Sequence, residues 1–167
     1  MSSSVIRSLR FLTYNTYLIP GWFVNRFNSS CLRQAERADA IGKLVVDNNV
    51  DVVFFQEVWG SNTDKLERRL TAGSNCSRLA ILPGYESWGG TWIDTLVRTV
   101  APRGGLYGAY RSSFVLTYLQ HQTFSFSNSR SRKGVLAALL DIRSHSWNGV
   151  ESLLVFCTHL DPTNLRE

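Results

Sequence analysis

The chain has 167 residues, of which 44% are hydrophobic and 19% are charged, with 18 lysines and arginines against 13 aspartates and glutamates. This length and apolar content suit one globular domain with a hydrophobic core and argue against a disordered chain. The net charge of +5 favours contact with the phosphate groups of lipid or nucleic acid without choosing between them, and a solvated surface with extra arginines explains it equally well.

The cysteines Cys31, Cys76 and Cys157 are isolated, and none lies in a Cys-x-x-Cys motif. Such an odd, sparse set predicts neither a disulfide framework nor a zinc site, and it favours a reducing compartment. The polar start lacks the apolar core of a signal peptide, and no run of about 18 apolar residues follows it. We therefore expect a cytoplasmic protein, or one peripheral at a membrane, with no signal peptide or transmembrane segment in this chain.

The first predicted elements are a strand and a helix. Aromatic and β-branched residues cluster over 10–15 before the breaker Pro20-Gly21, which predicts a short strand ending at Asn15. From Ser30 onward, apolar residues recur every three or four positions between charged ones, as in an amphipathic helix. Ser29 or Ser30 can cap the start of this helix, and Asn48-Asn49 can close it. Its apolar positions are Leu32, Ala35, Ala38, Ile41 and Val45.

Strands dominate the remainder of the prediction. The apolar run over 50–55 predicts a strand covered on both faces. A second helix is predicted from Asp64 to about Leu70, with Ser61 and Asp64 spaced as in a capping box. Residues 71–108 are rich in Gly, Pro and Trp and predict long loops with room for one hairpin. Strand-like runs then cover 113–119, 134–142 and 153–158. This order predicts a layered α/β (α+β) domain.

Three polar residues follow predicted strands and are candidates for chemistry. Glu57 ends the apolar strand, where its carboxylate could bind Mg²⁺; the alternative is a surface glutamate paired with an arginine. Asn15 could offer a neutral oxygen to a metal or a donor to a phosphate, although asparagine at such a position is often a turn former. His159 follows the last apolar strand and could contact a phosphate, or be satisfied by backbone. Sites in α/β sheets gather at the carboxyl ends of strands.

Five segments, taken in order, resemble the endonuclease/exonuclease/phosphatase superfamily across nearly the whole chain. Within that superfamily, the helix at Glu36, the Arg132-Lys133-Gly134-Val135 run and His159-Leu-Asp-Pro162 resemble the neutral sphingomyelinases. The five segments are Leu12-Thr-Tyr-Asn15, Glu36-Arg-Ala-Asp-Ala-Ile41, Asp51-Val-Val-Phe-Phe-Gln-Glu-Val58, Lys133-Gly-Val135 and Thr158-His-Leu-Asp-Pro162.

The resemblance implies a two-sheet sandwich flanked by helices and a magnesium-dependent phosphodiesterase. By this resemblance Glu57 holds the Mg²⁺, Asn15 assists at the metal and phosphate, and His159 contacts the scissile phosphate. Lys133 is a candidate for neutralising the substrate phosphate. The reaction would be in-line attack of water on sphingomyelin, a phospholipid, to give ceramide and phosphocholine.

The family also requires a Gly-Asp-x-Asn element and a late Asp-His pair after the Thr-His element, and neither occurs here. His121 and His145 precede that element, so neither replaces the late histidine by position. We therefore expect residues 1–167 to form a single partial domain, a truncated sandwich with an exposed sheet face, inactive by itself. The oligomeric state stays open.

Two alternatives remain. A nuclease or phosphoinositide phosphatase of the same superfamily is supported by a basic second half, which also suits anionic lipid surfaces. A non-catalytic fragment that binds lipid or protein is supported by the missing motifs. Trp88 and Trp92 could rest at a bilayer interface, although tryptophan is more often a core or protein-interface residue. The basic residues are Arg98, Arg103, Arg111, Arg130, Arg132 and Lys133.

Overall fold

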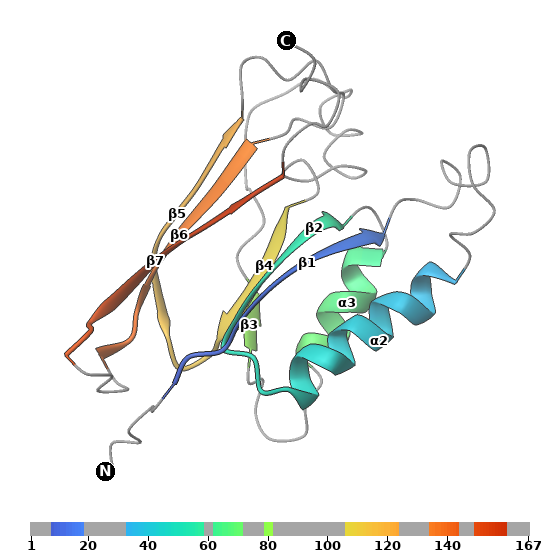
Figure 1. The fold of residues 1–167 in the computed structure, drawn as a ribbon, viewed down its shortest axis with the longest axis horizontal. Helices are drawn as coiled ribbons and strands as arrows, with labels where there is room; N and C mark the ends of the chain where they lie inside the picture. Colours follow the sequence, from blue (N-terminus) through green and yellow to red (C-terminus); the bar gives the residue numbers. More distant parts are fainter. Residues whose placement is uncertain are drawn as a thin grey trace.

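The computed structural model describes residues 8–18, 33–58, 62–71, 79–81, 106–123, 134–143 and 149–159, which form two helices and seven strands (Figure 1). The elements in chain order are β1 Phe11–Leu18, α2 Gln34–Asp47, β2 Val52–Val58, α3 Asn62–Thr71, β3 Leu79–Ile81, β4 Tyr107–Arg111, β5 Val115–Thr123, β6 Gly134–Asp141 and β7 Ser152–Thr158.

The strands form two sheets. The first sheet has the order β1-β2-β4-β3, in which β1 and β2 are parallel and β4 is antiparallel to both of its neighbours. The second sheet is the antiparallel set β5-β6-β7. Helices α2 and α3 cover one face of the first sheet, and the second sheet lies on its other side (Figure 1). The predicted mixed α and β sandwich flanked by helices is confirmed.

Strand β2 is the centre of this arrangement because both of its faces are buried. Val53 and Phe55, each 0% exposed, pack in the core cluster beneath the helices. Phe54 points the other way, into the cluster between the sheets, where it meets Leu136 and Leu140 of β6. This two-sided burial explains the uninterrupted apolar run in the sequence.

Helix α2 packs on the sheet through the apolar positions that its period predicted. Ala38, Ile41 and Val45 are buried. The closing asparagines are confirmed: the Asn48 side-chain amide donates to the carbonyl oxygen of Leu44 at 2.8 Å. At the other end, Arg33 is the N-cap residue and makes no side-chain capping bond. The suggested caps Ser29 and Ser30 lie outside the described residues, as does Ser61 before α3.

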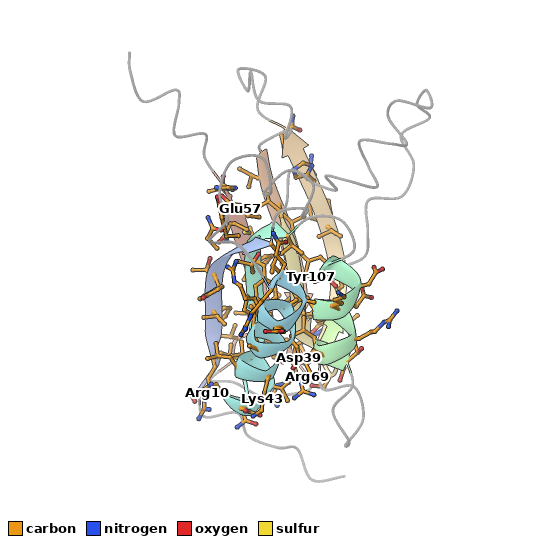
Figure 2. All side chains as sticks on the ribbon, turned by 90° about the vertical axis from the view of Figure 1, so that its right-hand side faces the viewer. Arg10, Asp39, Lys43, Glu57, Arg69 and Tyr107 are labelled. Carbon is orange, nitrogen blue, oxygen red and sulfur yellow. The ribbon has the colours of Figure 1, made fainter. Side chains whose placement is uncertain are left out.

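Helices α2 and α3 approach each other closely at Gly42. A Cβ added at Gly42 would lie 2.7 Å from both Cβ and Cγ of Arg69, so only glycine fits without moving the other helix. Arg69 also reaches Asp39 on α2, with Nε 3.5 Å from Oδ1 (Figure 2). The glycine lowers helix propensity but permits this helix pair to cover the sheet.

Residues 71–108 were predicted as loops with room for one hairpin, and within this range β3 pairs antiparallel with β4, which begins at Tyr107 and continues to Arg111. One predicted strand was wrong at its boundaries. The strand predicted at 113–119 instead begins at Val115 and continues to Thr123, since the Phe114 amide donates to the Arg111 carbonyl in a turn. Partners distant in the sequence decide the pairing of β3 with β4, and a local turn decides where β5 begins.

Among the described strands, β1 and β3 are at the edges of the first sheet and β5 and β7 at those of the second. Phe11 on β1 is 52% exposed, and Leu154 and Phe156 on β7 are 56% and 64% exposed. The expected exposed sheet face is therefore present in this part of the chain. Neither described helix has the length and apolar character needed to cross a membrane.

Candidate functional site

The two sheets meet where β2 and β7 end, and this junction brings together Glu57 and His159. The imidazole Nε2 of His159 lies 3.3 Å from Oε1 of Glu57, and the two side chains are 16% and 17% exposed. The contact becomes an ion pair when the imidazole is protonated. Figure 2 shows Glu57 toward one end of the first sheet, with Arg10 and Lys43 at the other end.

The second carboxylate oxygen of Glu57 is buried and has no hydrogen-bond partner among the residues that the structure describes. Leaving a carboxylate oxygen desolvated and unpaired is costly, so such an atom is typical of a site that receives a ligand. A hard cation such as Mg²⁺ fits this atom, because Mg²⁺ takes oxygen ligands and needs only one or two carboxylates besides water and phosphate. Across the described ranges, no cluster of three or more His, Cys, Asp or Glu side chains that could hold a metal ion is formed.

The backbone around Glu57 is unusual. Glu57 has φ 58°, in the left-handed region that residues with a Cβ rarely adopt. The hydroxyl of Thr16, a fully buried residue, donates to the carbonyl oxygens of Gln56 at 2.9 Å and Glu57 at 3.0 Å. The sequence pattern gave no sign of this role for Thr16.

Gln56 ties three strands together beneath the site. Its amide donates to the Thr13 hydroxyl of β1 at 3.0 Å and to the Cys157 sulfur of β7 at 3.2 Å. Gln56 is itself 9% exposed. The residue before Glu57 therefore fixes the end of β7, which carries His159 two residues beyond Cys157. Only the tertiary structure reveals this link.

The buried thiol of Cys157 gives a test of the sheet junction. Burial raises the pKa of Cys157 from its ordinary value of 9.0, and the bond from Gln56 opposes this effect. In the variant that combines Cys31→Ser with Cys76→Ser, Cys157 is the only cysteine left. We expect dithiobis(nitrobenzoate) at pH 8 to label it at least about tenfold more slowly in the folded chain than in the chain unfolded in urea. Rapid labelling of the native chain would contradict the buried junction.

The same raised pKa has a consequence for stability. The unfolded state loses the Cys157 proton at a lower pH than the folded state does, so the free energy of unfolding falls as the pH rises above about 9. A Cys157→Ser chain in the same background removes this contribution and serves as the control in urea titrations at pH 8 and pH 10.

The sequence predicted that Asn15 ends its strand. This was wrong, because β1 continues to Leu18. The ladder to β2 nevertheless shifts register immediately after Asn15, which pairs with Gln56. Its Oδ1 accepts a hydrogen bond from the Tyr17 amide at 3.1 Å, the local turn-forming bond that was the alternative interpretation. Asn15 is exposed, and its partner in the ladder, Gln56, is the residue before Glu57.

Lys133 lies outside the described residues. Its neighbour Gly134 begins β6, and the Thr158 hydroxyl donates to the Gly134 carbonyl at 3.0 Å, so this part of the second sheet adjoins the Thr-His element. His121 lies on β5 opposite Leu136, and β6 separates that strand from β7. His145 lies outside the described residues.

The basic cluster predicted for the second half is corrected at Arg111. This guanidinium pairs with the buried carboxylate of Asp51 at the amino end of β2, away from Glu57. Asp51 therefore neutralises the charge of Arg111, and Arg111 does not contribute to an open anion-binding surface. The remaining members lie outside the described residues, together with Trp88 and Trp92; they are Arg98, Arg103, Arg130, Arg132 and Lys133.

Solved structures share this arrangement of strands and helices. TDP2 from D. rerio, in complex with a single-strand DNA product, matches with TM-score 0.59 and 16% identity over 95% of this chain and 48% of its own. A β-hairpin deletion mutant of beta toxin from Staphylococcus aureus matches with TM-score 0.64 and 19% identity over 92% of this chain and 51% of its own. An endonuclease/exonuclease/phosphatase protein from Beutenbergia cavernae matches with TM-score 0.51 and 18% identity over 91% of this chain and 38% of its own.

This chain has the endonuclease/exonuclease/phosphatase fold. At these identities the likeness establishes the fold and leaves the substrate to other arguments. The chain spans about half the length of the first two of these structures. No family model matches the sequence, and no curated protein matches it. Within the endonuclease/exonuclease/phosphatase fold described here, Glu57 and His159 come from different sheets and meet at one edge of the sandwich.

Proposed function

We propose that the chain carries part of the active site of a magnesium-dependent phosphodiesterase resembling the neutral sphingomyelinases, with sphingomyelin as the phospholipid substrate. The observation that carries the proposal is the buried, unpartnered oxygen of Glu57 beside His159 at the carboxyl ends of β2 and β7. The fold supports a hydrolase of phosphate esters, and the sequence resemblance supports the choice of substrate.

The residues divide the work in this proposal. Glu57 would hold Mg²⁺ through its unpartnered oxygen, and Asn15, beside it on β1, would offer a neutral amide oxygen. His159 would donate to an oxygen of the scissile phosphate, and Lys133 would neutralise charge on the same group. When bound, the cation stabilises negative charge on the phosphoryl oxygens and on the leaving alkoxide of ceramide.

The late Asp-His pair of the resemblance, which would activate the attacking water, is not in this sequence. We therefore propose that the 167-residue chain by itself shows no appreciable turnover. Positioned acid–base catalysis contributes about 10²–10⁴-fold, so its loss alone would reduce hydrolysis to a residual rate.

The test compares substrates under one set of magnesium conditions. A polypeptide that extends this chain with the Gly-Asp-x-Asn and Asp-His elements is expected to release phosphocholine from sphingomyelin in mixed micelles, with little cleavage of plasmid DNA or of a phosphoinositide. The 167-residue chain, folded by circular dichroism, is expected to fall about 10²-fold or more below it. Robust turnover by the short chain, lost in His159→Ala, would contradict the need for the late pair.

A nuclease is the second candidate, because the net charge is +5 and the D. rerio TDP2 structure holds a DNA product. DNA cleavage without phosphocholine release would favour it, and cleavage of the phosphoinositide would favour a lipid phosphatase. A non-catalytic fragment remains the third candidate. It would be favoured by lipid or protein binding with no hydrolysis of any of the three substrates.

A further inference from the structure

The backbone of Glu57, the proposed metal ligand, stands in an unfavourable conformation. With φ 58°, Glu57 stands in a region where the Cβ crowds the neighbouring carbonyl. No glycine relieves that crowding here, so surrounding contacts must hold the peptide. Backbone outliers of this kind gather at functional sites, where the protein over-determines them.

The contacts that hold the peptide come from β1. The Thr16 hydroxyl is shared between the carbonyl oxygens of Gln56 and Glu57, at 2.9 Å and 3.0 Å, just where the ladder between β1 and β2 shifts register. The regular register is interrupted at this point, and the Thr16 side chain bonds across to β2 there. Thr16 is 0% exposed, so no water competes for its hydroxyl.

Thr16 is itself held by helix α2. Arg37 donates through Nη2 to the Thr16 carbonyl at 2.7 Å and through Nη1 to the Tyr17 carbonyl at 3.5 Å. Tyr17 also has positive φ, at 50°. A charged donor thus fixes the irregular end of β1, and the Thr16 hydroxyl passes this order to the end of β2.

We infer that Thr16 and Arg37 are positioning residues for the metal site of Glu57, acting through the main chain of Glu57 without touching the cation. This inference rests on the proposed function and names the residues that make its carboxylate a ligand. Groups that orient a metal ligand typically account for about 10–100-fold in metal affinity.

The experiment measures Mn²⁺ affinity of the 167-residue chain by electron paramagnetic resonance, since Mn²⁺ accepts the same oxygen ligands as Mg²⁺. Thr16→Val keeps the branched shape and removes the hydroxyl, so Mn²⁺ affinity is expected to fall about tenfold or more. Thr16→Ser restores the hydroxyl and is expected to return most of the affinity. A loss that reflected packing alone would not be rescued by serine, which is smaller than valine.

Thr117→Val is the matched control, because the Thr117 hydroxyl donates to the Leu139 carbonyl at 3.0 Å in the second sheet. It removes the same kind of bond away from Glu57 and is expected to bind Mn²⁺ as the wild type does. If Thr16→Val does not fold, Arg37→Met decides, because Arg37 is only partly buried on α2. Its expected result is also weaker Mn²⁺ binding.

Glu57→Gln separates this inference from the proposed function. If Glu57→Gln binds Mn²⁺ as tightly as the wild type, the proposed site is wrong and the inference falls with it. If Glu57→Gln loses the ion while Thr16→Val, or Arg37→Met in its place, retains wild-type affinity, the site stands and the positioning role is overturned.

Discussion

Replacing Glu57 with glutamine is expected to lower magnesium-dependent hydrolysis by at least about 10³-fold while the chain stays folded. The substitution keeps the shape of the side chain and removes the charge that the cation needs. The quantity to measure is kcat in the polypeptide that carries the downstream elements. Saturating Mg²⁺ is used so that a loss of metal affinity is not mistaken for a loss in the chemical step.

Two features of the structure sharpen this experiment. Oε2 of Glu57 is buried and has no partner in the described part of the chain, so in the absence of metal Glu57→Gln is not expected to lower the thermal unfolding midpoint. Glu36→Gln is the matched control, because Glu36 is exposed on α2 and its ion pair with the Arg33 guanidinium, at 3.7 Å, is exposed as well. Unchanged kcat in Glu57→Gln would remove Glu57 from the site.

Replacing Asp51 with alanine is expected to lower the free energy of unfolding by about 3 kcal/mol. Asp51 is 2% exposed at the amino end of β2, where Oδ2 accepts the Arg10 amide at 2.9 Å and Oδ1 accepts Nε of Arg111 at 2.5 Å. The carboxylate thus joins β1, β2 and β4 at one point. Removing the carboxylate leaves the Arg111 guanidinium and the Arg10 amide without their acceptor. Because Arg111 is partly exposed, the loss of stability is expected at the lower end of the range for a buried ion pair.

Urea denaturation at neutral pH measures this loss, with Asp47→Ala as the matched control. Asp47 pairs with Lys43 at 2.5 Å on the surface of α2, where both side chains are more than half exposed, so its removal is expected to cost about 0.5 kcal/mol or less. Asp51 lies at the end of β2 that is remote from Glu57. Its partner Arg10 is far from Glu57 in Figure 2. Mn²⁺ affinity in the folded Asp51→Ala chain is therefore expected to match the wild type. A loss of stability no larger than that of Asp47→Ala would contradict the structural role of Asp51.

Local sequence signals predicted the elements whose burial has one clear pattern. The strand β2 is buried on both faces, which leaves an uninterrupted apolar run in the sequence. Helix α2 is buried on one face, which leaves apolar residues every three or four positions. The same signals placed Glu57 and His159 at the carboxyl ends of strands. They did not reveal β3 or the full extent of β4, since short strands owe their conformation to partners across the sheet.

The site shows the same division between local pattern and tertiary contact. The sequence by itself determined that a carboxylate stands near the carboxyl end of a buried strand and that a histidine follows another strand, because both depend on neighbours along the chain. Only the tertiary structure decided that these side chains meet, that Arg111 neutralises Asp51, and that Asn15 lies inside a strand and not at its end. It alone also decided the bonds from Thr16 to the Glu57 peptide and from Gln56 to Cys157, which join residues 41 and 101 positions apart. Such bonds leave no periodic trace in a sequence, because their donors are ordinary polar residues whose partners are chosen by how the two sheets stack.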